Sequence, residues 1–254
     1  MSEILHSRVD GPADGPPLVL LGSLGSTIEM WEPNLPVLAE RFRVVRLDHL
    51  GHGGSPAPEG PYTMARLADA ALATLDSLGL ERVAWCGLSL GGMVGLYLGS
   101  ERPERISRLA LCCTSSYFPD RTAWPTRIAG VEADGTGGLA AAIVEKWFTP
   151  DWAAAHPAEV ARAVGWVADS PDDGYLACCR AIEAWDHRDR LGAVTAPTLV
   201  LGGESDRSTP VEPHSRTIAA GIPGARLEVV RGAHLATIEN PEETNRLLLE
   251  HLRD

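Results

Sequence analysis

A serine within a glycine-rich pentapeptide has the clearest chemical potential in this chain. The pentapeptide GLSLG at positions 87–91 has the pattern G-x-S-x-G and lies between an apolar run and a segment with helical character. Such a turn from strand to helix exposes a serine hydroxyl, and the helix N-terminus favours negative charge beside it. The alternative is a plain glycine-rich turn, but the flanking strand and helix favour a nucleophile. We therefore predict that Ser89 attacks a carbonyl carbon.

A serine hydroxyl needs an adjacent base at neutral pH, and the base needs an acid that fixes its tautomer. His234 follows the apolar run at 227–230, where a base can reach across to the serine. Asp206 follows the run at 198–201, and Glu204 is the alternative carboxylate on the same loop. We favour Asp206 because it lies further from the strand end. The serine, Asp206 and His234 form the predicted catalytic triad.

Attack on a carbonyl creates an oxyanion, which two backbone N–H groups should receive. One donor is the N–H of Leu90, directly after the nucleophile. The second is expected from the loop GSLGS at positions 22–26, which follows the apolar run at 18–21. We predict that Leu24 provides it, the alternative being a simple glycine turn.

The wider pattern predicts elements that can position these residues. Short apolar runs rich in β-formers alternate with segments of helical spacing, which is typical of a mostly parallel sheet covered by helices on both faces. We therefore predict the α/β fold class. The expected strands are 4–9, 18–21, 43–47, 83–86, 109–112, 198–201 and 227–230, and the expected helices are 64–78, 91–100, 213–220 and 241–252.

One segment breaks this alternation. Residues 119–187 contain no clear strand, hold five of the seven tryptophans, and show helical patterns such as that over 139–148. We interpret this segment as an inserted helical cap. The predicted core then comprises residues 1–118 and 188–254.

Composition excludes several function classes. The formal net charge of −12 disfavours nucleic acid and anionic membranes as partners. No apolar run approaches 18 residues, and no signal peptide is evident, so a cytoplasmic location is expected. Neither glycine-rich loop spells G-x-G-x-x-G or carries a P-loop lysine, and no metal motif occurs, so we expect neither cofactor nor metal. The five cysteines are predicted to be reduced and buried. The small-molecule substrate is the expected partner, and the sequence is compatible with a homo-oligomer.

Six stretches have patterns typical of one known family: MWEP (30–33), CGLSLGGMVG (86–95), AGV (129–131), KWFTP (146–150), GYLACC (174–179) and AHL (233–235). Together they resemble 3-oxoadipate enol-lactonase of the α/β-hydrolase superfamily. The resemblance runs over nearly the whole chain, and it implies the α/β-hydrolase fold, a triad at Ser89, Asp206 and His234, and a small carboxylate-bearing lactone as substrate. Two positions depart from the family pattern: Leu50 stands where arginine is typical, and Gly22 stands where asparagine or histidine is typical. The first strand also looks short or missing.

A substrate carboxylate would need a cation in this acidic protein, and arginine suits a carboxylate. We predict that Arg127, one helical turn from Trp124, provides it, and that Trp124 and Trp147 lie near the substrate. The alternative for Arg127 is a solvated cap side chain. The expected function is hydrolysis of a small ester or lactone through an acyl-enzyme. The alternatives are another carboxylesterase, a C–C bond hydrolase, an acyl-transfer enzyme, or a non-catalytic ligand receptor of the same fold.

Overall fold

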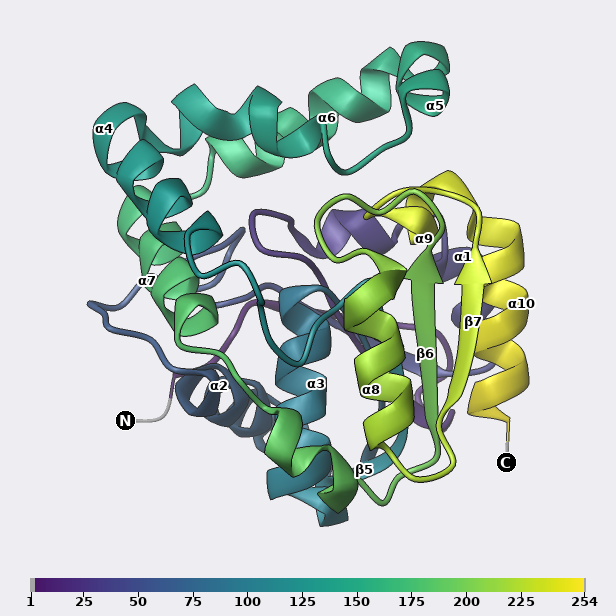
Figure 1. The fold of residues 1–254 in the computed structure, drawn as a ribbon. Coiled ribbons are helices and arrows are strands. Elements are labelled where there is room, and N and C mark those ends of the chain that lie inside the picture. The colour runs from purple at the N-terminus through teal and green to yellow at the C-terminus, as the bar shows by residue number, and fades with distance from the viewer. Residues whose placement is uncertain (1–2, 254) are drawn as a thin grey trace.

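The computed structural model describes residues 3–253 and contains a seven-stranded sheet with strand order β1-β3-β2-β4-β5-β6-β7 (Figure 1). β1 pairs antiparallel with β3, and all other neighbours pair in parallel. The predicted α/β class with a mostly parallel sheet is therefore confirmed. The strands are β1 (Ser7–Asp10), β2 (Pro17–Leu21), β3 (Arg43–Leu47), β4 (Val83–Leu88), β5 (Ile106–Cys112), β6 (Thr198–Gly203) and β7 (Arg226–Val230).

Burial along the strands follows their position in the sheet. β4 and β6 are buried at every residue, because central parallel strands are covered on both faces. The edge strands β1 and β7 are partly exposed, and Val9 and Val229 stand in solvent. This explains why the central strands are continuous apolar runs in the sequence, whereas the first strand carries only a weak signal.

Helices cover both faces of this sheet. α2 (Met64–Ser77), α3 (Leu90–Glu101) and α8 (Arg216–Gly221) gather on one face, whereas α1 (Leu35–Leu38) and α10 (Pro241–Leu252) pack together on the other (Figure 1). The short α9 (Ala236–Glu239) adjoins α10. α2 begins where Thr63 accepts a hydrogen bond from the N–H of Arg66, a standard N-cap. No helix within residues 3–253 has the length and apolar character needed to cross a membrane.

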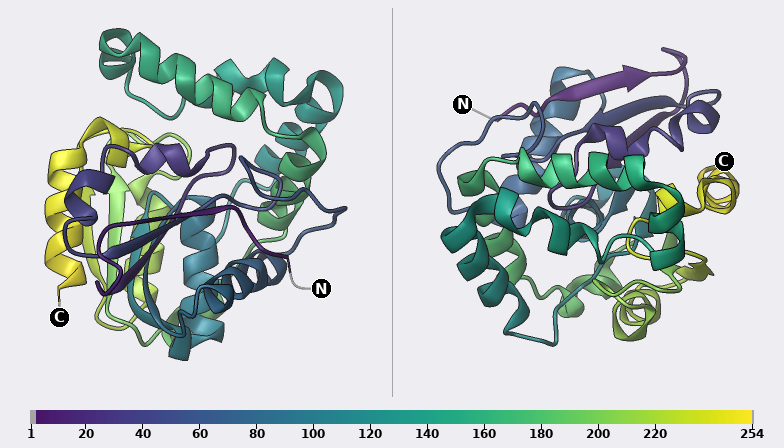
Figure 2. Two further views of the ribbon diagram at one scale, coloured as in Figure 1. Left: turned by 180° about the vertical axis from the view of Figure 1, so that it is seen from behind. Right: turned by 90° about the horizontal axis from the view of Figure 1, so that it is seen from above.

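Four helices between β5 and β6 stand apart from the sheet, above the ends toward which β6 and β7 point (Figures 1 and 2). The chain enters and leaves this layer at one place, because Tyr117 and Asp186 form an antiparallel bridge. The helices are α4 (Ala123–Val144), α5 (Pro150–Ala155), α6 (Pro157–Ala168) and α7 (Asp172–Glu183).

Several element bounds differ from those expected, most of them by one to three residues. The helix expected over 139–148 ends at Val144, because the chain turns there and presents the Trp147 carbonyl to the N–H of Leu235 at 2.9 Å. The edge strand expected over 4–9 runs over Ser7–Asp10. β4 continues beyond position 86 to Leu88, so the turn begins directly at the serine. Residues 1, 2 and 254 of the predicted core lie outside the described residues.

Candidate active site

Ser89 occupies a strained turn between β4 and α3. Its backbone has φ 55° and ψ −114°, a conformation that non-glycine residues rarely adopt. The turn is held by the N–H of Ser89, which donates to the Cys112 carbonyl at 3.0 Å, and by Thr114, whose hydroxyl donates to the Ser89 carbonyl at 2.6 Å. These hydrogen bonds hold the strained backbone in place, and the strained conformation presents the Ser89 side chain at the end of β4.

Two glycines make this turn possible. A Cβ atom at Gly87 would lie 2.1 Å from the Gly91 carbonyl oxygen, and one at Gly91 would lie 2.0 Å from the Leu21 carbonyl oxygen. Both neighbours are backbone atoms and cannot rotate away. The two glycines of the G-x-S-x-G pattern are thus required by close backbone contact.

Asp206 and His234 are hydrogen-bonded to each other. His234 Nδ1 lies 2.9 Å from Asp206 Oδ2 and 3.2 Å from Oδ1. Oδ1 also accepts the N–H groups of Ser208 and Thr209, at 2.7 and 3.0 Å, and Oδ2 accepts the Thr209 hydroxyl at 2.8 Å. Burial alone would raise the pKa of Asp206, but His234 and these donors outweigh it and lower the pKa. The carboxylate is therefore charged and held in one orientation.

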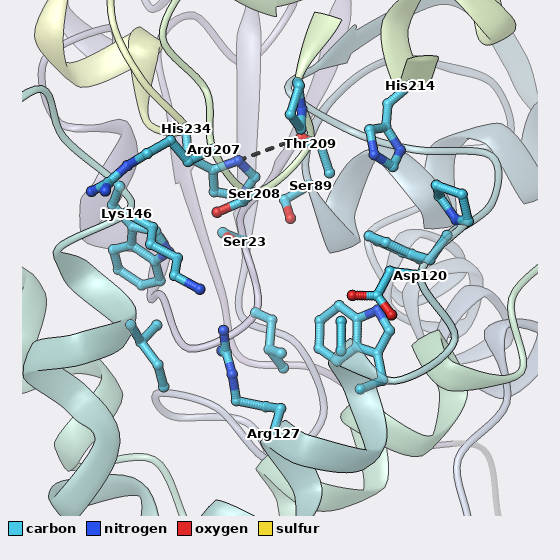
Figure 3. Close-up of a pocket in the computed structure, with 18 residues that line it drawn as sticks. Ser23, Ser89, Asp120, Arg127, Lys146, Arg207, Ser208, Thr209, His214 and His234 are labelled. Carbon is cyan, nitrogen blue, oxygen red and sulfur yellow. Dashed lines mark hydrogen bonds between the residues drawn. The ribbon is translucent and has the colours of Figure 1, made fainter. Parts of the chain in front are cut away.

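Ser89, Asp206 and His234 come together from three separate loops at the carboxyl edge of the sheet. Ser89 and His234 line the same cavity, where both labelled side chains are seen (Figure 3). No hydrogen bond joins their side chains in the part of the chain that the structure describes, 3–253. Without substrate such bonds are often long, so this geometry is compatible with a nucleophile and its base. The catalytic roles of the three residues stay predictions.

The two proposed oxyanion donors lie beside the serine. The N–H of Leu90 is the first of α3, and within residues 3–253 neither it nor the N–H of Leu24 has an acceptor. The loop that carries Leu24 is fixed by the Gly22 carbonyl, which accepts the N–H of Gly91 and His49 Nε2, each at 2.9 Å. The hydrogen bond from Gly91 to Gly22 therefore connects the loop of Leu24 to the turn of Ser89, as a preformed oxyanion hole requires.

The two departures from the family pattern have local explanations. A Cβ atom at Gly22 would lie 2.4 Å from Met30 Sδ and 2.5 Å from Ser26 Oγ, so the fold has filled that space. Leu50 is fully buried in the core, and its carbonyl accepts a hydrogen bond from His52. Neither position reaches the cavity.

The cavity has a volume of about 350 Å³ and lies between the strand ends and the α4 segment. All three residues predicted to bind substrate, Trp124, Arg127 and Trp147, line it. Arg127 is not a freely solvated cap residue: it donates to the Tyr175 hydroxyl at 2.9 Å and lies 5.9 Å from the Trp124 ring centroid. Across residues 3–253, no group of three or more His, Cys, Asp or Glu side chains is arranged to hold a metal ion.

Two further cations line the cavity that the sequence analysis did not single out. Lys146 is the single lysine of the 254 residues, and Arg207 directly follows Asp206. With Arg127 they oppose one lining carboxylate, Asp120. The rarity of lysine here was a usable signal for Lys146, whereas Arg207 resembles any loop arginine. The cavity lining is therefore more cationic than the acidic protein as a whole.

Glu239, which the sequence analysis also did not single out, connects the loop of His234 to the segment at 147–149, which directly precedes α5. Its Oε1 accepts the N–H of Ala233 at 2.6 Å, and its Oε2 accepts the Thr149 hydroxyl at 2.6 Å. On the other side of His234, the N–H of Leu235 donates to a carbonyl of the same segment. The backbone is thus fixed on both sides of His234.

Comparison with known proteins shows the family to which this chain belongs. Residues 16–241 match the family model described as the alpha/beta hydrolase fold. The chain is 31% identical to 3-oxoadipate enol-lactonase 2 of Acinetobacter baylyi over 95% of this chain and 90% of that enzyme. It is 33% identical to a putative carbamate hydrolase of Variovorax paradoxus, covering 98% of this chain and 96% of the relative. The crystal structure of the enol-lactonase from Burkholderia xenovorans superposes with a TM-score of 0.96 at 34% identity, covering 98% and 96% of the two chains. The resemblance seen in the sequence is confirmed: this chain belongs to the α/β-hydrolase family.

Proposed function

We propose that this protein hydrolyses a small ester or lactone through a Ser89 acyl-enzyme, and that its substrate is 3-oxoadipate enol-lactone or a close relative. The observation that carries the proposal is the strained Ser89, facing the same cavity as a histidine that a buried carboxylate orients. A plain structural turn has no need of a positive φ at a serine in a cavity. Similarity to enol-lactonases supports the substrate class.

The proposed reaction proceeds in two displacements. Ser89 Oγ bonds to the carbonyl carbon while His234 Nε2 takes its proton, and the N–H groups of Leu24 and Leu90 receive the oxyanion. The bond to the leaving oxygen then breaks, and that oxygen takes the proton from His234. Water repeats the sequence: its oxygen bonds to the acyl carbon while His234 takes its proton, the acyl–Oγ bond then breaks, and Ser89 Oγ takes that proton from His234. Asp206 stabilises the imidazolium in both steps.

The cationic lining supports a substrate that carries a carboxylate. Arg127, Lys146 and Arg207 line the cavity, and guanidinium and ammonium groups are the usual partners of carboxylates. Residues 119–187, which include the first two of these, act in this proposal as a cap that selects the substrate. The tryptophans 124 and 147 supply apolar walls on either side.

The first experiment compares the wild type with Ser89→Ala on 4-nitrophenyl acetate, following both the initial burst and steady-state turnover. We expect the burst to vanish and kcat to fall by about 10⁴-fold or more. Ser77→Ala, a serine on the outer side of α2, is the matched control and should keep full activity. Equal rates for wild type and Ser89→Ala would refute the proposed nucleophile.

The second experiment addresses the carboxylate. We compare 4-nitrophenyl butanoate with the mono-4-nitrophenyl ester of glutaric acid, beside 3-oxoadipate enol-lactone generated enzymatically. Arg127→Gln and Lys146→Met should each lower kcat/KM for the two carboxylate substrates about tenfold and change the neutral ester less than about twofold. Arg180→Gln, an arginine that pairs with Glu132 on the exposed side of the cap helices, is the control. Equal losses on all substrates would contradict the carboxylate assignment.

A further inference from the structure

A second histidine lines the cavity and has no part in the proposed triad. His214 lies in the short helical turn η4 (Val211–Ser215), is almost fully buried, and stands on the opposite side of Ser89 from His234 (Figure 3). Nothing in the two-displacement scheme requires it. Its hydrogen bonds nevertheless define what it can do.

The hydroxyl of Ser115 fixes the tautomer of His214. Ser115 Oγ accepts the N–H of Tyr117 at 3.0 Å and donates its only hydrogen to the Tyr117 carbonyl. It therefore has no hydrogen left for His214 Nδ1, which lies 2.7 Å away. The bond between them exists only if Nδ1 carries the proton and donates to Ser115. In the neutral ring, Nε2 is then an acceptor.

The acceptor nitrogen faces the cavity without a protein partner. Among residues 3–253, nothing hydrogen-bonds to His214 Nε2, although the ring lines the cavity and Phe118 packs against it at 5.6 Å between centroids. Burial lowers the pKa of His214, while Asp206 opposes that shift without cancelling it, so the ring is neutral at pH 7. A neutral imidazole with a free lone pair is a site for a hydrogen-bond donor.

We infer that His214 is a specificity-determining residue, whose Nε2 accepts a hydrogen bond from a hydroxyl or N–H group on the acyl portion of the substrate. The inference rests on the proposed function, because that reaction fixes the direction of the leaving group. The leaving oxygen must lie toward His234, which protonates it, and the oxyanion must lie toward Leu24 and Leu90. The acyl chain takes the remaining direction, away from His234, where His214 stands (Figure 3).

The inference narrows the substrate class. An acyl group without a donor displaces water from Nε2 and leaves this nitrogen without a hydrogen bond, whereas a hydroxy-acyl or N–H-bearing acyl group donates to it directly. Leaving a buried polar group without its partner is penalised, so the site discriminates between the two kinds of substrate. The favoured relative of the enol-lactones is therefore one whose acyl side bears a hydroxyl or an N–H.

The test uses pairs of substrates in which a methyl group replaces the hydrogen of the donor hydroxyl. The 4-nitrophenyl esters of 2-hydroxybutanoic and 3-hydroxybutanoic acid are compared with those of their methyl ethers. We expect the wild type to show a higher kcat/KM, by about tenfold, for the hydroxy member of at least one pair. If neither pair shows a preference for the hydroxyl, the inference is overturned.

Three variants separate the acceptor from a structural role. His214→Asn retains a polar atom near the position of Nδ1 but lacks the cavity acceptor, so it should abolish the hydroxyl preference. His214→Gln places an amide oxygen near the position of Nε2 and should retain much of the preference. His214→Phe also lacks an acceptor, so it should abolish the preference by lowering kcat/KM more for the hydroxy esters than for the methyl ethers. Equal losses on hydroxy and methoxy esters in His214→Asn would show a merely structural residue.

The outcome is independent of the nucleophile test. Activity that survives Ser89→Ala would refute the proposed function, whatever His214 does. Activity that depends on Ser89 but shows no donor preference would refute the role of His214 alone.

Discussion

Replacing Asp206 with asparagine tests how the base is oriented, because the surroundings allow the new amide only one orientation. Oδ1 accepts two backbone N–H groups, from Ser208 at 2.7 Å and Thr209 at 3.0 Å. Only an oxygen can take that place, so the amide NH₂ must take the place of Oδ2. That position lies 2.9 Å from His234 Nδ1. The substitution therefore puts a donor where the native carboxylate accepts a hydrogen bond from His234.

The expected loss of kcat follows from the tautomer of His234. In the proposed mechanism His234 donates from Nδ1 to Asp206 and keeps the Nε2 lone pair for the Ser89 proton. An NH₂ group opposite Nδ1 makes Nδ1 the acceptor and moves the ring proton to Nε2, where it blocks the base. A histidine held in the wrong tautomer costs about 10⁴-fold in kcat, or about 5.5 kcal/mol in activation free energy. The substitution Asp206→Asn should reach that loss although size and shape are unchanged.

The assay is kcat on 4-nitrophenyl butanoate at pH 7.5, with urea unfolding of each variant to verify that it is folded. Thr209→Val is the control, since it removes one hydrogen bond from Oδ2 at 2.8 Å but leaves the charge and the histidine tautomer. We expect Thr209→Val to lose less than about tenfold. A folded Asp206→Asn variant with more than a tenth of native activity would refute the reasoning, as would equal losses in the two variants.

Three further predictions concern the frame of the site. Gly91→Ala puts a Cβ atom 2.0 Å from a carbonyl oxygen of β2 and should lower the free energy of unfolding by about 2 kcal/mol or more, whereas Gly165→Ala, with no atom within 4 Å, should raise it by about 0.5 to 1 kcal/mol; urea titrations that rank them the other way would contradict the contact argument. Glu239→Ala should lower kcat about tenfold with little change in KM, because the loop of His234 loses its hydrogen bonds to the segment at Thr149, and Glu239→Gln should recover most of it in the same ester assay. Burial, reinforced by a neighbouring histidine, lowers the pKa of His49 to about 3, and the ordinary value in the unfolded chain is about 6.5. The unfolded state therefore binds this proton first, so stability is complete above pH 6.5 and is lost as the pH falls toward 3. His49→Gln should make that loss shallower by up to about 1.4 kcal/mol per pH unit, and unfolding curves with unchanged slope between pH 7 and 5 would disprove it.

The parts of the fold that sequence reasoning predicted are those whose signal is local. The bounds of β3 and α10 agree with the expected ranges, since one is a buried apolar run and the other a proline-started amphipathic helix. The residues of the predicted triad could be selected from the sequence for the same reason. Each lies on the loop that follows a strand, and parallel strands end at one edge of the sheet. The edge strand β1 was placed three residues early at its start, because an exposed edge has a weak apolar pattern.

The parts that sequence reasoning missed depend on partners far along the chain. Glu239 was indistinguishable from a solvated helix residue, because its partner Thr149 is 90 positions away. The proposed acceptor role of His214 depends on Ser115, which is 99 positions away, and on the bonds that Ser115 makes to Tyr117. The predicted helix over 139–148 ended early because the chain there meets the loop of His234. No local propensity records such contacts.

The contrast between local and long-range signals also separates the proposed catalytic residues from the residues that line the rest of the cavity. The proposed nucleophile, base and acid lie on loops of the sheet, whose strand pairing fixes their mutual positions. The cations and aromatic rings that face them come mostly from the α4 segment and the turn after it, which meet the sheet loops through a few hydrogen bonds such as those of Glu239. A substitution in the cavity wall can therefore change which substrate fits, while the strand ends keep the relative positions of Ser89, Asp206 and His234. This is why the sequence indicates a hydrolase more sharply than its substrate, and why matched substrate pairs on cavity variants are the informative measurement.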